Sequence, residues 1–376
     1  MTQTYQIARL FNGERFHRDA WLTIDNGKIV ALGHGQAPSQ AKVLTGTLVP
    51  GFVDVQVNGG GGALFNGDRS VNAIATIGAA HARYGTTAFL PTLITDSLSV
   101  LQEGADAIAA ALREQCPGVI GVHFEGPHLS VAKKGVHSAE HIRPLTDAEM
   151  AVYTRSDLGT VVVTLAPETV PASQIAELVA AGVRVCLGHS NADYATAQAA
   201  LEAGASGFTH LFNAMSPFTS REPGMVGAAL LDPHSWCGLI VDGHHVDDAS
   251  LKLAIQAKAA QKMMLVTDAM PPVGVEGDTF TLLGRTIRRD GDKLTAPTGE
   301  LAGSVLDMAS AVRNSVHRLG VSEAEAFRMA SRYPAEFLGL EQPGRLRVGG
   351  RADMVLLDDD FQVQQCWIGG EAVLKP

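Results

Sequence analysis

Short apolar runs recur along the middle of the chain, and helix-like, alanine-rich segments separate most of them. The runs are rich in β-branched residues and fit buried strands, while several of the intervening segments end in glycine, a common helix stop. Strands are predicted at residues 51–57, 86–93, 119–124, 160–166, 183–187, 207–211, 237–241 and 263–267. This alternation predicts an α/β protein with a (β/α)8 barrel of the TIM type, in preference to a doubly wound sheet.

The two ends of the chain have a different pattern, in which short β-like stretches are separated by turn residues. Residues 4–49 contain three such stretches, with Asn-Gly turns at 12–13 and 26–27. Residues 344–374 fit a strand, a glycine turn, a strand, an acidic turn and a strand. Because chain ends often lie close together, we expect a small β-sandwich domain built from residues 1–49 and 343–376. The barrel domain would then span residues 50–342.

The composition of the chain limits which binding partners and which cellular location are expected for the protein. The formal net charge of −10 argues against a nucleic-acid or anionic-membrane surface, although a few local cations can still bind a small anion. The four cysteines are scattered, which fits reduced thiols in a cytoplasm. The first residues lack the features of a signal peptide, and no apolar run is long enough to span a membrane. We therefore expect a cytoplasmic protein.

Polar residues follow the ends of successive predicted strands, where (β/α)8 barrels place their chemistry. A single polar residue at such a position usually satisfies loop backbone, but a series of strands ending in this way indicates a site. The series comprises Gln56, Asn58, Glu125, His189, His210, the segment 242–245 and Asp268. Within it, Glu125, His189 and His210 are the predicted metal ligands. One carboxylate and two imidazoles suit a divalent metal, most simply Zn2+, with Fe2+, Co2+ and Mn2+ as alternatives.

Further residues are candidates for catalysis and anion binding. Asp268 ends the eighth predicted strand and is the candidate general acid and base, although an aspartate there could also cap the following turn. His137 follows the third strand and could polarise a substrate carbonyl, with a surface role equally open. Arg221 and His245 are candidate anion contacts.

The stretch "LVPGFVDVQVNGGGG", residues 48–62, raises a question about the metal. Gln56 and Asn58 lie two residues apart and so share one face of the predicted strand. Many metal-dependent hydrolases have a His-x-His pair on such a strand, whereas amides are poor metal ligands. From the residues alone, the strand has either lost a metal or never bound one.

A set of motifs resembles the N-acetylglucosamine-6-phosphate deacetylases of the amidohydrolase superfamily. The motifs, in order from about residue 49 to 308, are "PGFVDVQVNGGGG", "HFEGPHLS", "KKGVHS", "GHSNADY", "THLFNAMSPFTSREPG", "DGHHV", "LVTDAM" and "LAGSVLDM". The resemblance implies a metal-containing barrel with a β-sandwich and a homodimer. It also implies hydrolysis of N-acetyl-D-glucosamine 6-phosphate to D-glucosamine 6-phosphate and acetate, in amino-sugar catabolism and cell-wall recycling.

The resemblance also implies roles for individual residues. Glu125, His189 and His210 would hold the metal, Asp268 would be the acid and base, and His137 would hydrogen-bond the acetyl oxygen or a ring hydroxyl. The implied sugar-phosphate contacts are Val136, Asn213, Ala214, Arg221, Asp242, Gly243, His244, His245, Leu301, Ala302 and Gly303, with Arg221 and His245 facing the phosphate.

In such proteins Gln-x-Asn can replace His-x-His and leave one tightly held metal per subunit. Gln56 and Asn58 would then orient water or a ligand through hydrogen bonds. His128 is a departure from the pattern, and either lines the pocket or supports a second metal. Other readings stay open: an N-acetylgalactosamine 6-phosphate or other N-acyl substrate, or a non-catalytic sugar-phosphate sensor. A nucleotide-binding oxidoreductase is disfavoured because the dinucleotide fingerprint is missing.

Overall fold

Eight parallel strands form the barrel, and their hydrogen-bonded order β5-β8-β9-β10-β11-β12-β13-β14 follows the order along the chain. The computed structural model describes residues 2–38 and 40–373. The last strand meets the first where the Asp268 amide donates to the Gln56 carbonyl at 3.0 Å. The predicted barrel is therefore confirmed. Its strands are β5 (Phe52–Val57), β8 (Thr86–Ile94), β9 (Gly121–Glu125), β10 (Thr160–Leu165), β11 (Arg184–Leu187), β12 (Gly207–Phe208), β13 (Trp236–Leu239) and β14 (Met263–Leu265).

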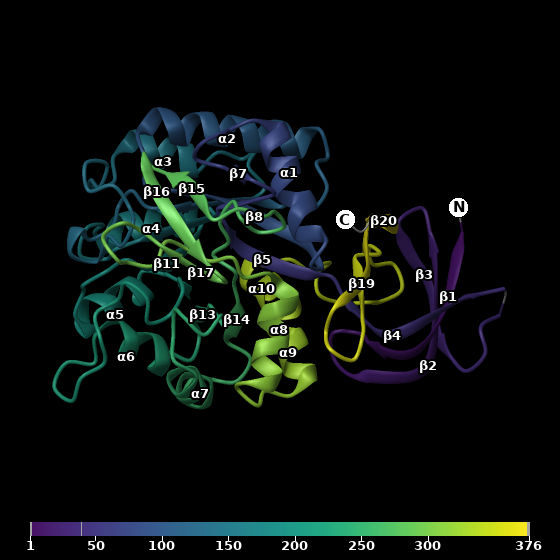
Figure 1. The fold of residues 1–376 in the computed structure, drawn as a ribbon. Coiled ribbons are helices and arrows are strands. Elements are labelled where there is room, and N and C mark those ends of the chain that lie inside the picture. The colour runs from purple at the N-terminus through teal and green to yellow at the C-terminus, as the bar shows by residue number, and fades with distance from the viewer. Residues whose placement is uncertain (1, 39, 374–376) are drawn as a thin grey trace.

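Helices surround the strands and bury the apolar core between the two layers (Figure 1). Serine and aspartate side chains cap several of them, as Ser97 does for α2 and Asp193 for α5. None of the helices in the described part of the chain has both the length and the apolar character that crossing a lipid bilayer requires. The helices are α1 (Val71–Ala82), α2 (Leu98–Arg113), α3 (Asp147–Tyr153), α4 (Ala172–Ala180), α5 (Tyr194–Glu202), α6 (Gly224–Leu231), α7 (Asp248–Ala257), α8 (Met308–His317), α9 (Glu323–Ala330), α10 (Arg332–Leu338) and the short 3-10 helix η1 (Val131–Lys133).

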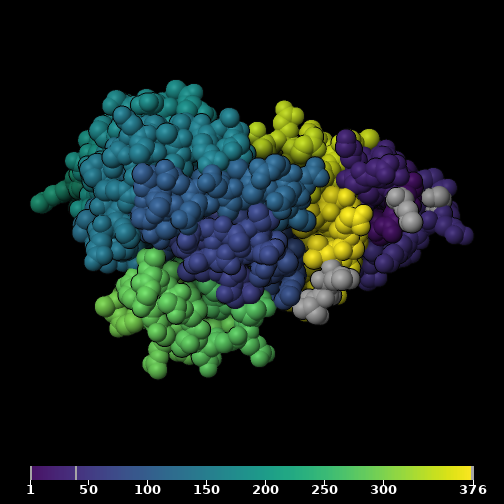
Figure 2. Space-filling view, turned by 90° about the horizontal axis from the view of Figure 1, so that it is seen from above, coloured from purple at the N-terminus to yellow at the C-terminus, as the bar shows by residue number. Residues whose placement is uncertain are grey.

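Strands from both ends of the chain share a second sheet, in the order β20-β19-β18-β4-β1-β2-β3. Figure 2 shows the purple N-terminal and yellow C-terminal segments side by side, next to the barrel. The predicted Asn-Gly turns lie after β1 and between β2 and β3. The strands are β1 (Gln3–Phe11), β2 (Phe16–Asp25), β3 (Lys28–His34), β4 (Lys42–Pro50), β18 (Met354–Leu357), β19 (Val363–Ile368) and β20 (Glu371–Val373).

One predicted strand at the C-terminal end is absent. Residues 344–348 form no ladder. They contact the sheet through a bond from the Leu346 amide to the Asn12 carbonyl, and the Leu346 side chain is buried in the apolar cluster of the sheet. The third strand of that segment is instead β20, which follows the glycine turn at 369–370. Residue 374 lies outside the described residues, and the division into domains at residues 49 and 343 stays a prediction.

The pattern of hydrophobic and polar residues did not predict the three-stranded antiparallel sheet that lies between β14 and α8 along the chain. We call this sheet the roof (residues 279–295). It consists of β15 (Thr279–Leu282), β16 (Arg285–Asp290) and β17 (Lys293–Thr295). Its strands are short and mostly polar, with single apolar residues such as Ile287 facing inward. A second small sheet, β6 (Gly59–Gly60) with β7 (Ala63–Leu64), follows β5.

His81 in α1 is a buried histidine that makes the fold sensitive to acid. Its Nε2 donates to the Gly59 carbonyl at 2.9 Å, and burial lowers its pKa to about 4. An unfolded chain binds this proton near pH 6.5, so stability is complete above pH 6.5 and is lost as the pH falls towards 4. We expect this group alone to cost up to about 3 kcal/mol of unfolding free energy.

Urea unfolding at pH 7, 5.5 and 4.5 measures that loss. His81→Gln keeps an N–H for the Gly59 carbonyl but does not titrate, so its stability should fall less steeply over this range. Equal slopes for the wild type and the variant would exclude His81 as a source of the acid sensitivity.

Candidate metal centre and active site

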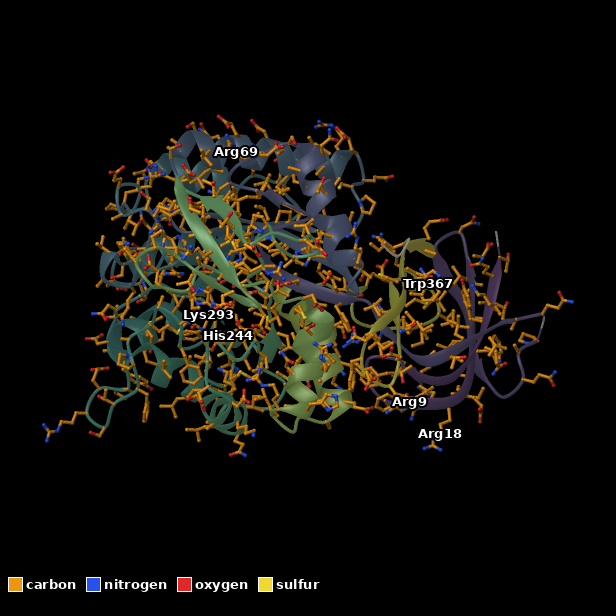
Figure 3. The ribbon with its side chains drawn as sticks, viewed as in Figure 1. Arg9, Arg18, Arg69, His244, Lys293 and Trp367 are labelled. Carbon is orange, nitrogen blue, oxygen red and sulfur yellow. The ribbon has the colours of Figure 1, made fainter. Side chains whose placement is uncertain are left out.

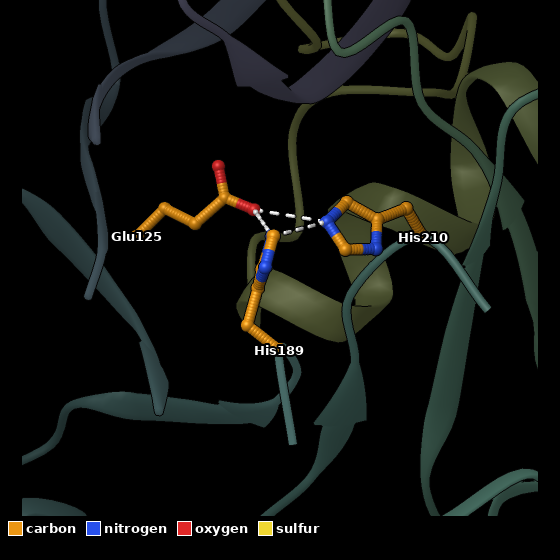
Figure 4. Close-up of side chains that lie close together, drawn as sticks. All are labelled: Glu125, His189 and His210. Carbon is orange, nitrogen blue, oxygen red and sulfur yellow. Dashed lines mark hydrogen bonds and ion pairs between the residues drawn. The ribbon is translucent and has the colours of Figure 1, made fainter. Parts of the chain in front are cut away.

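Three side chains from neighbouring strand ends converge at the mouth of the barrel. Glu125 ends β9, His189 follows β11 and His210 follows β12, and all three are buried. Glu125 Oε1 lies 3.0 Å from His210 Nε2 and 3.3 Å from His189 Nε2. The two Nε2 atoms are 3.1 Å apart (Figure 4). The structure thus brings the three predicted ligands together, and their ligand atoms all lie within 4.8 Å of one another.

The backbone around the cluster determines which ring nitrogen of His189 is available. His189 Nδ1 lies 2.8 Å from the Lys133 carbonyl, and a carbonyl can only accept, so Nδ1 carries the hydrogen. The lone pair of Nε2 therefore faces Glu125 and His210. His210 Nε2 points to the same place, while its buried Nδ1 has no partner among the residues that the structure describes. A hydrogen on Nδ1 and a free lone pair on Nε2, as in His189, is the arrangement found in histidines that bind a metal through Nε2.

The charge of the cluster also fits a cation. Burial alone would raise the pKa of Glu125, but the imidazoles of His189 and His210 hold that pKa well below its ordinary value. An ionised carboxylate and an imidazole lone pair meeting at about 3 Å are satisfied by a positive charge between them. The residues present therefore fit a divalent metal ion.

Three of the residues that point into the barrel mouth have backbone angles that L-amino acids rarely adopt. The φ angles of His189, His210 and Asp268 are 48°, 33° and 51°. Each lies just past the end of a strand, and each side chain lines the cavity at the barrel mouth. Such conformations cost free energy and gather at functional sites. The backbone strain at these three strand ends therefore accompanies the placement of their side chains in the site.

Asp268 is held by the two amides on β5 that raised the question about the metal. Gln56 Nε2 donates to Asp268 Oδ1 at 3.1 Å, and Asn58 Nδ2 donates to the same oxygen at 2.7 Å. Gln56 Nε2 also donates to Glu125 Oε1 at 3.1 Å. Both amides therefore act as donors to carboxylates. Because they occupy Oδ1, the other oxygen, Oδ2, is left to exchange a proton.

Burial raises the pKa of Asp268 to about 6, and the neighbouring charge of Glu125 acts in the same direction. A carboxyl with a pKa near neutrality can both accept and release a proton at working pH.

His137 is a hydrogen-bond donor to the cavity. Its Nδ1 lies 2.8 Å from the Thr95 hydroxyl and 3.3 Å from the Thr95 amide nitrogen. Nδ1 must accept from the amide, because a backbone N–H can only donate. The ring proton is therefore on Nε2. Burial lowers the pKa of His137 well below its usual value, and the nearby His189 adds to this effect, so the ring is neutral. A neutral imidazole with its N–H facing inward can bind a carbonyl oxygen or a developing negative charge.

A cavity of about 220 Å³ lies over these groups. It collects most of the predicted site, and adds two apolar residues and a glycine that sequence reasoning missed, because nothing in their local pattern marks them. Its lining consists of Ile94, Glu125, Gly135, Val136, His137, His189, His210, Asn213, Ala214, His245, Asp268, Met270, Leu301 and Gly303.

The remaining predicted contacts lie outside this lining. Asp242 contacts His245 through Oδ2, which lies 2.6 Å from His245 Nδ1, and its Oδ1 accepts hydrogen bonds from the amides of residues 244 and 245. His244 turns away to Asp292 of the roof at 2.7 Å. Ala302 is buried in the apolar cluster under the roof, and Gly243 lies between Asp242 and His244 in the turn.

Arg221 is exposed and makes no hydrogen bond or ion pair within the described part of the chain. Its neighbour Glu222 does not pair with it. The Glu222 carboxylate accepts the amides of Tyr194 and Gly224 and so fixes the loop from which Arg221 projects. In a single chain, Arg221 is not among the residues that line the cavity.

His128 has both ring nitrogens engaged away from the cluster. Nδ1 lies 3.0 Å from the Arg143 carbonyl and Nε2 lies 3.1 Å from the Tyr153 hydroxyl. Neither nitrogen is available to a metal ion in this arrangement. His128 is also absent from the lining of the cavity, so the prediction that it lines the pocket is wrong, and the structure supports a buried, hydrogen-bonded role instead.

The barrel and the cluster at its strand ends define a hydrolase of the amidohydrolase family. The chain belongs to this family, whose model matches residues 47–373. It is similar to N-acetylgalactosamine-6-phosphate deacetylase of Shewanella sp. (strain ANA-3), with 51% identity over 89% of this chain and 85% of the relative. It is 39% identical to N-acetylglucosamine-6-phosphate deacetylase of Bos taurus over 87% of this chain and 83% of that protein.

Among solved structures, the chain matches the crystal structure of N-acetylglucosamine-6-phosphate deacetylase from Pasteurella multocida. The TM-score is 0.95 at 35% identity, with 99% of each chain covered. The likeness extends over both the barrel and the sheet made from the chain ends.

Proposed function

We propose that the protein hydrolyses the acetamide of N-acetyl-D-glucosamine 6-phosphate, giving D-glucosamine 6-phosphate and acetate in amino-sugar catabolism. The observation that carries this proposal is the meeting of Glu125, His189 and His210 with Asp268 in one cavity. The similarity to deacetylases of phosphorylated amino sugars supports the choice of substrate.

Glu125, His189 and His210 would hold one divalent metal per chain, most simply Zn2+, with Fe2+, Co2+ or Mn2+ as alternatives. Such an ion acidifies water and polarises a carbonyl. Asp268 takes the proton of the attacking water on Oδ2 and later gives it to the leaving amine. His137 donates its Nε2 hydrogen to the acetyl oxygen as negative charge develops there. Gln56 and Asn58 keep the Asp268 carboxyl in place through Oδ1.

The phosphate would be bound near His245, whose ring is oriented by Asp242. We keep Arg221 as the second phosphate contact. Because it is exposed and outside the cavity of a single chain, its contact needs either closure of its loop or a neighbouring copy. A homodimer, which we also propose, would supply such a copy. We place the enzyme in the cytoplasm.

A second candidate substrate is N-acetyl-D-galactosamine 6-phosphate. The 51%-identical Shewanella relative, which has that deacetylase name, favours it. The two sugars differ at C4 alone, so the acetamide, the phosphate and the catalytic groups would play the same parts.

Acetate release from both phosphorylated epimers and from unphosphorylated N-acetylglucosamine tests the proposal. We expect kcat/KM for the unphosphorylated sugar to be lower by about 100-fold or more, because charge-assisted hydrogen bonds to the phosphate are lost. A higher kcat/KM for the galactose epimer would assign the enzyme to the second candidate. Equal values with and without phosphate would refute the phosphate assignment, and binding without acetate release would indicate a sensor.

A further inference from the structure

The roof rests directly on the wall of the cavity. Its inward side chains Leu282, Ile287 and Leu294 are at most 1% exposed. They share one apolar cluster with Ile94, Val136, Met270 and Ala302, most of which line the cavity. At its far end the roof is tied to the barrel by the contact of Asp292 with His244, and Figure 3 shows Lys293 of the roof beside His244.

Arg285 of the roof is bonded to two chain segments, each of which contains residues that line the cavity. One guanidinium nitrogen, Nη2, donates to the main-chain carbonyl of Val136. The other, Nη1, donates to Glu300 Oε1 at 3.3 Å. The residue after Val136 is His137, and the residue after Glu300 is Leu301. Arg285 itself does not line the cavity.

Two sets of contacts determine the orientation of the His137 ring. One is Thr95, whose amide donates to Nδ1 and whose hydroxyl lies 2.8 Å from it. The other is the main chain at 134–137, a turn closed by the bond from the His137 amide to the Lys134 carbonyl at 3.0 Å. Arg285 holds this turn from outside through the Val136 carbonyl. With Thr95 fixed by β8, movement of the turn would rotate the Nε2–H away from its target.

We propose that Arg285 is a positioning residue that sets the direction of the His137 Nε2–H by holding the 134–137 turn against the roof. The proposal rests on the hydrolytic function proposed above, in which that N–H binds the acetyl oxygen. Loss of the tie lowers the rate of the chemical step more than it weakens substrate binding, because charge on the oxygen is greatest in the transition state.

The geometry of arginine is required at this position. Its planar fork presents two nitrogens to two acceptors at once, whereas lysine offers a single point charge. Arg285 and Glu300 have side chains that are 32% and 29% exposed, so their ion pair adds little to stability. A change in activity at this position therefore does not require a change in folding.

The first experiment compares Arg285→Gln and Arg285→Lys with Arg288→Gln, an exposed arginine on the same strand. We expect kcat to fall about tenfold in both Arg285 variants, with KM changed less than about threefold and an unchanged melting temperature. Arg288→Gln should match the wild type. Wild-type kcat in Arg285→Gln, or an equal fall in Arg288→Gln, would overturn the proposal.

A double variant tests whether Arg285 acts through His137. In a His137→Asn background, Arg285→Gln should cause no further fall in kcat, since the group it positions is already gone. If the two effects multiply, Arg285 acts by another route and the proposal is wrong.

Amide hydrogen exchange over residues 131–138 provides a readout that needs neither substrate nor turnover. Exchange in this segment should rise in Arg285→Gln and stay at the wild-type level in Arg288→Gln. A wild type that releases no acetate would refute the proposed function while leaving this result valid. An active enzyme with unchanged exchange in Arg285→Gln would refute the positioning role alone.

Discussion

Replacing Asp268 with asparagine is expected to lower kcat by about a thousandfold or more while metal content and substrate affinity stay close to the wild type. Asparagine has nearly the same shape and keeps an oxygen for the amides of Gln56 and Asn58, but it cannot take a proton from water. Asp268 is not one of the three residues proposed to hold the metal, so its loss should leave the cation in place. Acetate release, elemental analysis and calorimetric titration with substrate measure the three quantities.

Asp360→Asn is the matched control, because Asp360 is an exposed aspartate in the turn between β18 and β19. It should have wild-type kcat. Full activity in Asp268→Asn would remove this carboxyl from the mechanism, and loss of metal in that variant would show that it acts as a ligand.

Removing the metal is the second change with a large expected effect. Protein treated with a chelator should release acetate at less than about a hundredth of the wild-type rate, and added Zn2+ should restore it. The melting temperature should also fall, because an ion that binds only the folded chain stabilises it. Acetate assays and thermal unfolding before and after readdition check both effects, and parallel additions of Fe2+, Co2+ and Mn2+ rank the metals.

Variants locate the metal. His189→Ala and His210→Ala should each purify with little bound metal, whereas His234→Ala, at an exposed histidine, should retain it. A stripped protein that works as fast as the metal-loaded form would contradict the whole assignment. Normal metal content in both cluster variants would place the ion elsewhere.

The sequence was sufficient for the barrel and for the cluster of Glu125, His189 and His210 because both depend on order along the chain. Apolar runs alternating with helices define the (β/α)8 topology, and this topology brings the carboxyl ends of all its strands to one face. Glu125, His189 and His210 each lie at or just after a predicted strand. Their convergence follows from these positions, although they are up to 85 residues apart.

Features that depend on distant side-chain contacts needed the tertiary structure. Gln56 and Asn58 both donate a hydrogen bond to Oδ1 of Asp268, which lies more than 200 positions away along the chain. The exposure of Arg221 and the engagement of His128 with Tyr153 depend on loops whose course no local pattern specifies.

The sequence by itself therefore determined which elements form and which residues stand at their ends, since hydrophobic period and turn chemistry are local properties. Only the tertiary structure decided how each site residue is used. Partners from other segments determine that His189 Nδ1 carries a hydrogen and that His137 Nδ1 accepts one. They also determine how the roof packs against the cavity wall. A hydrogen bond of about 3 Å has a direction as well as a length, and neither can be read from spacing along a chain.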